Sequence, residues 1–178
     1  MAKYRRRRRY YRSKGRWSSN IQEINTTTVT SQGLGSNFYS MVLAYNPPQT
    51  NTSTSQIYTV KNLEVSFNVD EAPNVNTQAA EDVCVYLMYV PQGMNVTINY
   101  VAEHPEYIMN YKFIGSPSVD TPSSQAQPTK VRSRLSRRLN TGDYLMLFIK
   151  YTDTRSSNTS PGAGFNLHGI ARWWTKAN

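Results

Sequence analysis

Several segments of the chain after its first twenty positions alternate between apolar and polar residues. The clearest case is Leu63, Val65, Phe67 and Val69, which alternate with Glu64, Ser66, Asn68 and Asp70. Successive side chains of a strand point to opposite faces, so this period of two predicts a strand with one buried face and one wet face. Alternation, β-branched runs or continuous apolar runs predict further strands at Ile24–Thr30, Phe38–Tyr45, Val83–Val90, Asn95–Tyr100, Tyr107–Ile114, Tyr144–Tyr151 and Phe165–Thr175.

The apolar residues also assign the faces of several of these strands. In Phe165–Thr175, one face carries Phe165, Leu167, Ala171 and Trp173. Val83–Val90 is apolar on both faces and too short for a typical core helix, which indicates a strand covered on both sides. In Phe38–Tyr45, one face takes Phe38, Val42 and Ala44, and the other takes Tyr39, Met41, Leu43 and Tyr45.

Polar segments rich in Pro, Gly, Ser, Thr and Asn separate the predicted strands. They comprise loops at Asn46–Gln56, Glu71–Glu81, Ser116–Pro128 and Thr152–Gly164, and turns at Pro91–Gly93 and Asn140–Asp143. Seven to nine strands with such connections, and no pattern typical of a long helix, predict an all-β fold. The expected architecture is a two-sheet antiparallel sandwich or barrel.

One segment, Lys130–Leu139, fits two structures. Its apolar residues Val131, Leu135 and Leu139 recur every four positions, as on a basic amphipathic helix. As a strand, it places Val131, Ser133 and Leu135 on one face and Arg132, Arg134 and Ser136 on the other. A Gly-Asp turn and a strongly apolar strand follow at once, which favours the strand.

The charge of the chain is concentrated in its first sixteen residues, MAKYRRRRRYYRSKGR. They hold nine of the 20 Lys and Arg residues and no acidic residue, whereas the remaining 11 Lys and Arg balance all 11 Asp and Glu. The net charge of +9 therefore lies in one arm. Five consecutive arginines bury nothing, so we expect the arm to be disordered alone and ordered against a polyanion. The predicted organisation is an arm at 1–19, with a hinge at Trp17–Asn20, and a domain at 20–178.

Groups that could support catalysis are few. Cys84 is the only cysteine, His104 and His168 are the only histidines, and no common metal, phosphate or nucleophile motif occurs. Glu103–Glu106 could form a metal or acid/base site, but adjacent residues rarely converge on one ion, so a polar turn is favoured. We expect Cys84 to be a small buried hydrophobe. The sequence thus predicts no enzyme, no catalytic residue, no metal and no cofactor. Because no apolar run approaches the roughly 20 residues needed to cross a bilayer, it also predicts no membrane insertion.

Binding chemistry is better represented. Aromatic rings are interleaved with the cations of the arm, which suits single-stranded nucleic acid, because bases stack on rings while phosphates meet guanidinium groups. A run of Arg and Lys also serves as a nuclear-localisation signal, and the two roles are compatible. The candidate nucleic-acid-binding residues are Lys3, Tyr4, Arg5, Arg6, Arg7, Arg8, Arg9, Tyr10, Tyr11, Arg12, Lys14, Arg16 and Trp17. A possible second basic stripe consists of Lys130, Arg132, Arg134, Arg137 and Arg138, although a charge run can equally be a solvated face.

Several stretches resemble the capsid proteins of small circular single-stranded DNA viruses, the circovirus-like, Rep-encoding group. They are the arm, VYLMYVPQG at Val85–Gly93, HPEYIMNYKFIGSP at His104–Pro117, RSRLSRRLNTGDYLMLFI at Arg132–Ile149, and ARWWTKAN at Ala171–Asn178. No single motif is diagnostic, but their order and spacing together are fairly specific. The segment Asn20–Ala80 is similar in character only.

This resemblance implies a single jelly roll of two four-stranded sheets, many copies of which close into an icosahedral shell. It also implies that the arm points inward onto a single-stranded DNA genome, with import receptors of the host nucleus as further partners. The protein would then be found in the virion and, during infection, in the host nucleus and cytoplasm. A satellite-type RNA virus coat protein would obey the same physics, so RNA stays open as the genome. A cellular RNA-binding protein of ribosomal type would share the arm, but would usually carry basic residues over its folded face as well.

Overall fold

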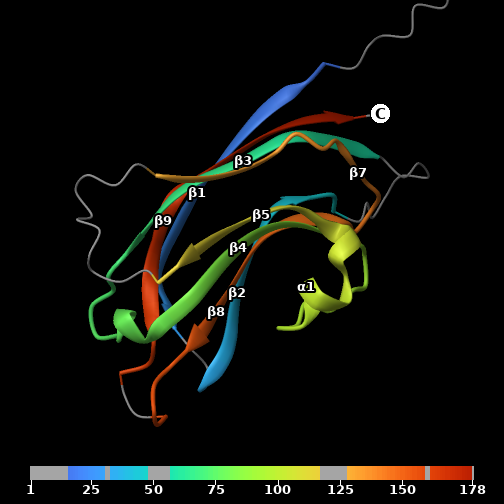
Figure 1. Cartoon of the computed structure of the whole chain (residues 1–178). Helices are drawn as coiled ribbons and strands as arrows, with labels where there is room; N and C mark the ends of the chain where they lie inside the picture. The colour runs from blue at the N-terminus through green and yellow to red at the C-terminus, as the bar shows by residue number, and fades with distance from the viewer. Residues whose placement is uncertain (1–15, 31–32, 48–56, 117–127, 159–160, 178) are drawn as a thin grey trace, which may run out of the picture.

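The folded part of the chain is built from nine strands and three short helical turns. The structure, a computed structural model, describes residues 16–30, 33–47, 57–116, 128–158 and 161–177 (Figure 1). The strands are β1 (Ser18–Thr30), β2 (Gly35–Tyr45), β3 (Tyr58–Asp70), β4 (Ala80–Val90), β5 (Ile108–Gly115), β6 (Thr129–Ser133), β7 (Arg137–Leu139), β8 (Tyr144–Asp153) and β9 (Gly164–Ala177). The helical turns are η1 (Thr77–Ala79), α1 (Tyr100–Glu103) and η2 (Pro105–Tyr107). The all-β prediction is confirmed.

The strands form two sheets that face each other. The first has the order β1-β9-β3-β6, with β7 also paired to β3, and the second has the order β2-β8-β4-β5. In Figure 1 the two sheets form separate layers, and α1 lies beside the second one. Every recorded strand pairing is antiparallel.

The pairing defines a jelly roll. Strands from the two ends of the chain pair in nested order: β1 with β9, β2 with β8, β3 with β6 and β7, and β4 with β5. Successive strands β1 to β4 also alternate between the two sheets. This is a long antiparallel ribbon wrapped around a core, which is the jelly-roll topology. The expected jelly roll of two antiparallel sheets is confirmed. The second sheet has four strands as expected, whereas the first has five, because β6 and β7 both pair with β3 at its edge.

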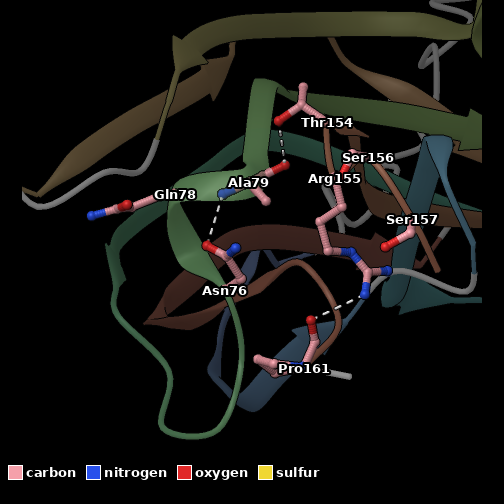
Figure 2. A pocket seen from close by; sticks show the side chains of 8 residues that line it. All are labelled: Asn76, Gln78, Ala79, Thr154, Arg155, Ser156, Ser157 and Pro161. Carbon is pink, nitrogen blue, oxygen red and sulfur yellow. Dashed lines mark hydrogen bonds between the residues drawn. The ribbon is translucent and has the colours of Figure 1, made fainter. Parts of the chain in front are cut away.

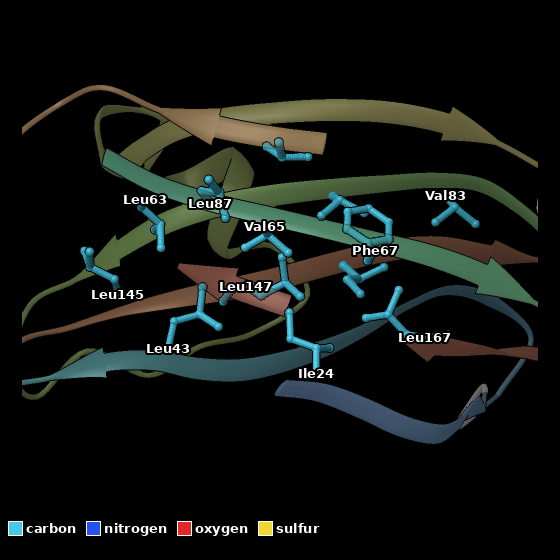
Figure 3. Close-up of a cluster of buried hydrophobic side chains, with 14 of the residues drawn as sticks. Ile24, Leu43, Leu63, Val65, Phe67, Val83, Leu87, Leu145, Leu147 and Leu167 are labelled. Carbon is cyan, nitrogen blue, oxygen red and sulfur yellow. The ribbon is translucent and has the colours of Figure 1, made fainter. Parts of the chain in front are cut away.

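The inner faces of the two sheets enclose the main core (Figure 3). Leu63, Val65 and Phe67 of β3 are almost completely buried, as their alternation predicted. The inward residues of β9 that the sequence assigned to one face, among them Phe165 and Trp173, also lie in this core. Each large apolar side chain buried in this way stabilises the fold by roughly 1.5–3 kcal/mol. A shift of one residue would move these side chains from the core to solvent, so their burial explains why β3 and β9 keep their observed pairing.

A second apolar cluster covers the outside of the second sheet. Met88 and Val90 of β4 pack there with Tyr100, Met146 and Phe148, while Val83, Val85 and Leu87 face the main core. The prediction that Val83–Val90 is a strand buried on both faces is confirmed. The strand predicted at Asn95–Tyr100 is wrong. That segment passes outside the sheet and ends in α1, because Tyr100 is buried against the second cluster and does not join a ladder.

The ambiguous segment Lys130–Leu139 is a strand interrupted once. β6 ends at Ser133, whose hydroxyl accepts a hydrogen bond from the backbone N–H of Leu135 at 3.2 Å, and β7 begins at Arg137. Val131 and Ser133 are buried together as predicted, but Leu135 is 51% exposed. The local turn closed by Ser133 therefore removes Leu135 from the buried face that strict alternation assigned to it.

Two other segments differ locally from the sequence prediction. The hinge expected at Trp17–Asn20 is wrong for most of its length, because β1 begins at Ser18, which pairs with Thr175. In β2, the register shifts between Val42 and Ala44. This bulge buries Leu43 and Ala44 together, although alternation placed them on opposite faces.

The turn at Asn140–Asp143 is confirmed and is held by one carboxylate. Asp143 is buried and accepts hydrogen bonds from the Tyr89 hydroxyl at 2.7 Å, the Asn140 backbone N–H at 2.8 Å and the Gln92 backbone N–H at 3.0 Å. Gly142 adopts a φ of 87°, a value that glycine tolerates best. The carboxylate thereby joins the predicted turns at Pro91–Gly93 and Asn140–Asp143. Much of the predicted loops at Asn46–Gln56 and Ser116–Pro128 lies outside the described residues.

Candidate nucleic-acid interface

The arm reaches the sandwich at the end of the first sheet where β1 begins. Among its candidate residues only Arg16 and Trp17 belong to the described part of the chain, and the residues from Lys3 to Lys14 lie outside it. Arg16 is exposed. Trp17 is half-buried, and Lys61 Nζ lies 3.9 Å from the centre of its ring. Trp17 therefore anchors the root of the arm to β3 through a cation–π contact.

Cross-strand register shows which residues project from the outer face of the first sheet. Residues paired across a sheet share a face, and alternate residues point inward. Ile21, Arg172, Glu64 and Arg132 form one row across β1, β9, β3 and β6. The neighbouring rows are Glu23, Ile170, Ser66 and Lys130 on one side, and Ser19, Trp174 and Lys61 on the other, followed by Lys176, Thr59 and Arg138.

Three members of the predicted second basic stripe lie on this outer face. Lys130 and Arg132 project from β6, and Arg138 projects from β7. Arg132 Nε lies 3.6 Å from Glu64 Oε2. Both side chains of that pair are partly exposed, so the interaction contributes little to stability.

The other two members of the stripe lie elsewhere. Arg137 pairs with the inward-facing Val60, so its side chain turns toward the second sheet and not toward the outer face. There its Nη2 donates to the Glu106 carbonyl at 3.3 Å, and its guanidinium carbon lies 5.6 Å from the centre of the Tyr89 ring. Arg134 is exposed in the connection between β6 and β7. The five charges are therefore close in sequence but do not form one stripe on one face of the domain.

The outer face also gathers residues that sequence reasoning did not single out. These are Lys61 on β3, and Arg172, Trp174 and Lys176 on β9. One signal was available, since the alternation that buries Ala171 and Trp173 sends Arg172 and Trp174 outward. The overall balance of 11 basic and 11 acidic residues concealed the cluster, because a sum over the chain carries no information about position.

Two hollows lie away from this face. One, of about 390 Å³, is lined mostly by polar residues of the segments before β4 and after β8 (Figure 2). Its only cation, Arg155, is already engaged, because Nη2 donates to Asp153 at 2.7 Å and Nη1 donates to the Pro161 carbonyl at 3.0 Å. The other, of about 370 Å³, opens between the sheets beside Tyr45, Tyr58 and Trp173. Neither hollow contains the residues that the sequence predicted to bind nucleic acid.

The described residues offer few groups for other chemistry. Within those ranges, no three His, Cys, Asp or Glu residues are grouped so as to hold a metal ion. Glu103–Glu106 is a polar turn as predicted, where His104 Nδ1 lies 3.4 Å from Glu106 Oε1 and its ring stacks on Tyr107. Cys84 is buried, as predicted. Among the same residues, none of the helices has the length and apolar character required to span a bilayer.

Comparison with known proteins gives distant structural matches alone. No protein-family model and no curated protein matches the chain. A solved structure of turnip yellow mosaic virus is 10% identical, with 92% of this chain and 94% of that chain covered and a TM-score of 0.44. Desmodium yellow mottle tymovirus is 15% identical, covering 92% and 88% with a TM-score of 0.41. The decameric BFDV capsid protein is 8% identical, covering 92% and 100% with a TM-score of 0.37. At this distance, the strand pairing of the chain itself carries the fold assignment.

Proposed function

We propose that this chain is the capsid protein of a small circular single-stranded DNA virus. Many copies assemble into an icosahedral shell, and the arginine-rich arm binds the packaged genome and serves as a nuclear-localisation signal. The observation that supports this most directly is that a strongly basic arm is joined to a domain without net charge. An arm with nine positive charges leads directly into the first strand of a jelly roll whose remaining charges sum to zero.

Each part has the physical property that its role requires. A domain without net charge can approach copies of itself without strong repulsion, and jelly rolls are a common architecture of viral shells. The arm supplies the opposite property, because its cations neutralise phosphates and its aromatic rings can stack on unpaired bases. The resemblance of four segments to circovirus-like capsid proteins supports the same assignment.

Sedimentation and electron microscopy of the purified full-length protein test the proposal. Closed particles are expected at moderate salt, and nucleic acid extracted from them should be degraded by DNase and resist RNase. RNase-sensitive contents would instead indicate the coat protein of a satellite-type RNA virus. A protein that stays monomeric at high concentration, with and without single-stranded DNA, would contradict the capsid assignment.

A further inference from the structure

The charges of the folded domain are segregated although they sum to zero. Six of the 11 Lys and Arg residues that follow the arm project from the outer face of the first sheet, which we name the basic face. They are Lys61, Lys130, Arg132, Arg138, Arg172 and Lys176. Within the described ranges, the acidic residues on this face are Glu23, Glu64 and Asp70, and Asp70 lies at the end of β3 far from the arm. The basic face thus carries a net charge near +3 beside the root of the arm.

Most of these cations lack an acidic partner. Within the described residues, Arg132 is the only one of the six in an ion pair, with Glu64. Like charges placed on adjacent strands repel each other, so their concentration costs free energy until a polyanion binds. The arrangement therefore favours a phosphate-rich ligand over bare solvent.

Exposed apolar side chains lie among the cations. Trp174 is 42% exposed between Ser19 and Lys61, and Ile21 and Ile170 are 69% and 41% exposed in the next two rows. Along β9, Lys176, Trp174 and Arg172 recur at every second residue, which spaces them roughly 7 Å apart. Cation, ring and cation then follow one another along a single strand.

This order of cations and an aromatic ring favours some polyanionic ligands over others. In a single strand, the bases are free to stack on an aromatic ring while the phosphates meet cations on either side. In a duplex, the bases are paired and stacked internally, so an exposed Trp on a flat sheet would gain little. Acidic peptides would satisfy the cations but would leave the Trp174 ring without a matching flat partner. Single-stranded nucleic acid is therefore the ligand whose chemistry the basic face fits best.

We propose that the basic face is a second binding surface for single-stranded nucleic acid, continuous with the arm, in which Trp174 stacks on a base while Lys61, Arg172 and Lys176 hold the flanking phosphates. This inference rests on the proposed function, because it takes the nucleic acid bound by the arm as its ligand. Trp17 joins the two surfaces, since its ring contacts Lys61 at the point where the arm enters β1.

The salt dependence of binding tests the cations. The probe is a single-stranded dT oligonucleotide, and the protein is the full-length chain, kept below the concentration at which it sediments as particles. Arg172→Gln combined with Lys176→Gln should reduce the log–log salt slope by about 1.4, because each phosphate contact on a single strand contributes roughly 0.7. The matched control is Lys112→Gln combined with Lys150→Gln, which removes the same charge from the second sheet and should leave the slope nearly unchanged.

The ring is tested separately. Trp174→Ala should weaken binding by roughly five-fold to a hundred-fold with no change in salt slope, because stacking does not release counterions. Trp174→Phe should restore most of the affinity, which a purely structural role for the indole would not predict. Ultraviolet cross-linking of the wild-type chain to the oligonucleotide should label the peptide that contains Trp174. Thermal unfolding of every variant checks that the fold is intact.

Distinct results overturn this inference and the proposed function. If the Arg172 and Lys176 variant binds with the wild-type slope, or if Trp174→Ala loses assembly but keeps its affinity for DNA, the basic face is not a nucleic-acid surface. In the second case it is a contact between subunits. If the variants behave as expected but the wild-type protein forms no particles, the basic face stands and the capsid assignment fails.

Discussion

At the scale of single residues, close approach of strands makes Gly169 unusually intolerant of change. Gly169 lies in β9 between Ile24 of β1 and Phe67 of β3. A Cβ at this position would meet the Ser66 carbonyl oxygen and would lie 2.6 Å from Phe67 Cβ and 2.7 Å from Phe67 Cα. Two of these atoms belong to the backbone of β3, which is held by its pairing with β9. The clash therefore cannot be relieved by a side-chain movement alone.

We therefore predict that Gly169→Ala lowers the free energy of unfolding by about 3 kcal/mol or more, as expected for a severe overpacking. Denaturant unfolding measures the change. Gly33→Ala is the matched control, because no atom lies within 4 Å of the added Cβ; its effect should stay within about 0.5 kcal/mol. Equal effects at the two positions would show that steric contact is not the cause.

Buried phenols should make the fold sensitive to alkali. Burial raises the pKa of Tyr89 from 10.0 to about 12, and its hydrogen bond to Asp143 adds to the shift. Burial also raises the pKa values of Tyr86, Tyr100 and Tyr151. A phenol with a higher pKa in the folded state binds its proton more tightly there, so its stabilisation is complete below pH 10.

Stability should therefore fall as the pH rises from about 10 toward 12 and beyond. The free energy of unfolding, measured in denaturant across this range, checks the expectation. Tyr89→Phe should make the decline shallower without abolishing it, because the other buried phenols continue to titrate. A free energy that stays constant from about pH 9 to pH 12 would contradict the prediction.

At the scale of elements, α1 shows how one side chain can override a local pattern. Val96, Ile98 and Tyr100 alternate as well as the residues of many strands, yet the segment forms no ladder. Tyr100 is fully buried in the second cluster, and its ring lies 4.9 Å from that of His104. The free energy gained when Tyr100 packs on Met88, Val90 and Phe148 determines where this segment lies.

Two substitutions at Tyr100 should separate packing from hydrogen bonding. Tyr100→Ala should cost roughly 3–5 kcal/mol, because it leaves a large cavity under α1. Tyr100→Phe should be neutral or slightly stabilising, since the hydroxyl is buried with no hydrogen-bond partner among the described residues. Denaturant unfolding again provides the values. A cost for Tyr100→Phe that matches that of Tyr100→Ala would mean that the hydroxyl makes an essential bond.

At the scale of the whole molecule, charge and fold divide between different parts of the chain. The main core draws on β1 to β9 and includes no residue before Ile24, so the arm contributes nothing to it within the described residues. The arm carries nine cations, which allow a log–log salt slope of at most roughly −6 for single-stranded DNA.

Deletion of residues 1–16 should consequently leave the fold intact and remove most of the affinity and of the salt slope. Circular dichroism and oligonucleotide binding at several salt concentrations measure the two effects. The remaining slope should trace to the basic face. If the shortened chain bound DNA as tightly as the whole chain, with an unchanged slope, the arm would not be the main genome contact.

Local information was enough to predict much of this protein. Alternation at Leu63–Val69 and the two-sided apolar run at Val83–Val90 indicated strands and buried faces, because those features depend on neighbours two residues apart. The predicted turn at Asn140–Asp143 likewise depends on residues close in sequence. The basic arm and the single buried cysteine needed only composition and order.

Other features depend on contacts between distant parts of the chain. Sheet register directs the Arg137 side chain toward Tyr89 and assembles the basic face from β3, β6, β7 and β9. Packing against the second cluster places Tyr100 over the second sheet. Alternation with a period of two shows which residues share a face of one strand, but it does not show which strand lies beside that strand. Lys61 and Trp174 are neighbours only because pairing of β3 with β9 brings together residues more than a hundred positions apart. Tertiary packing alone could therefore place these cations and this ring on one surface.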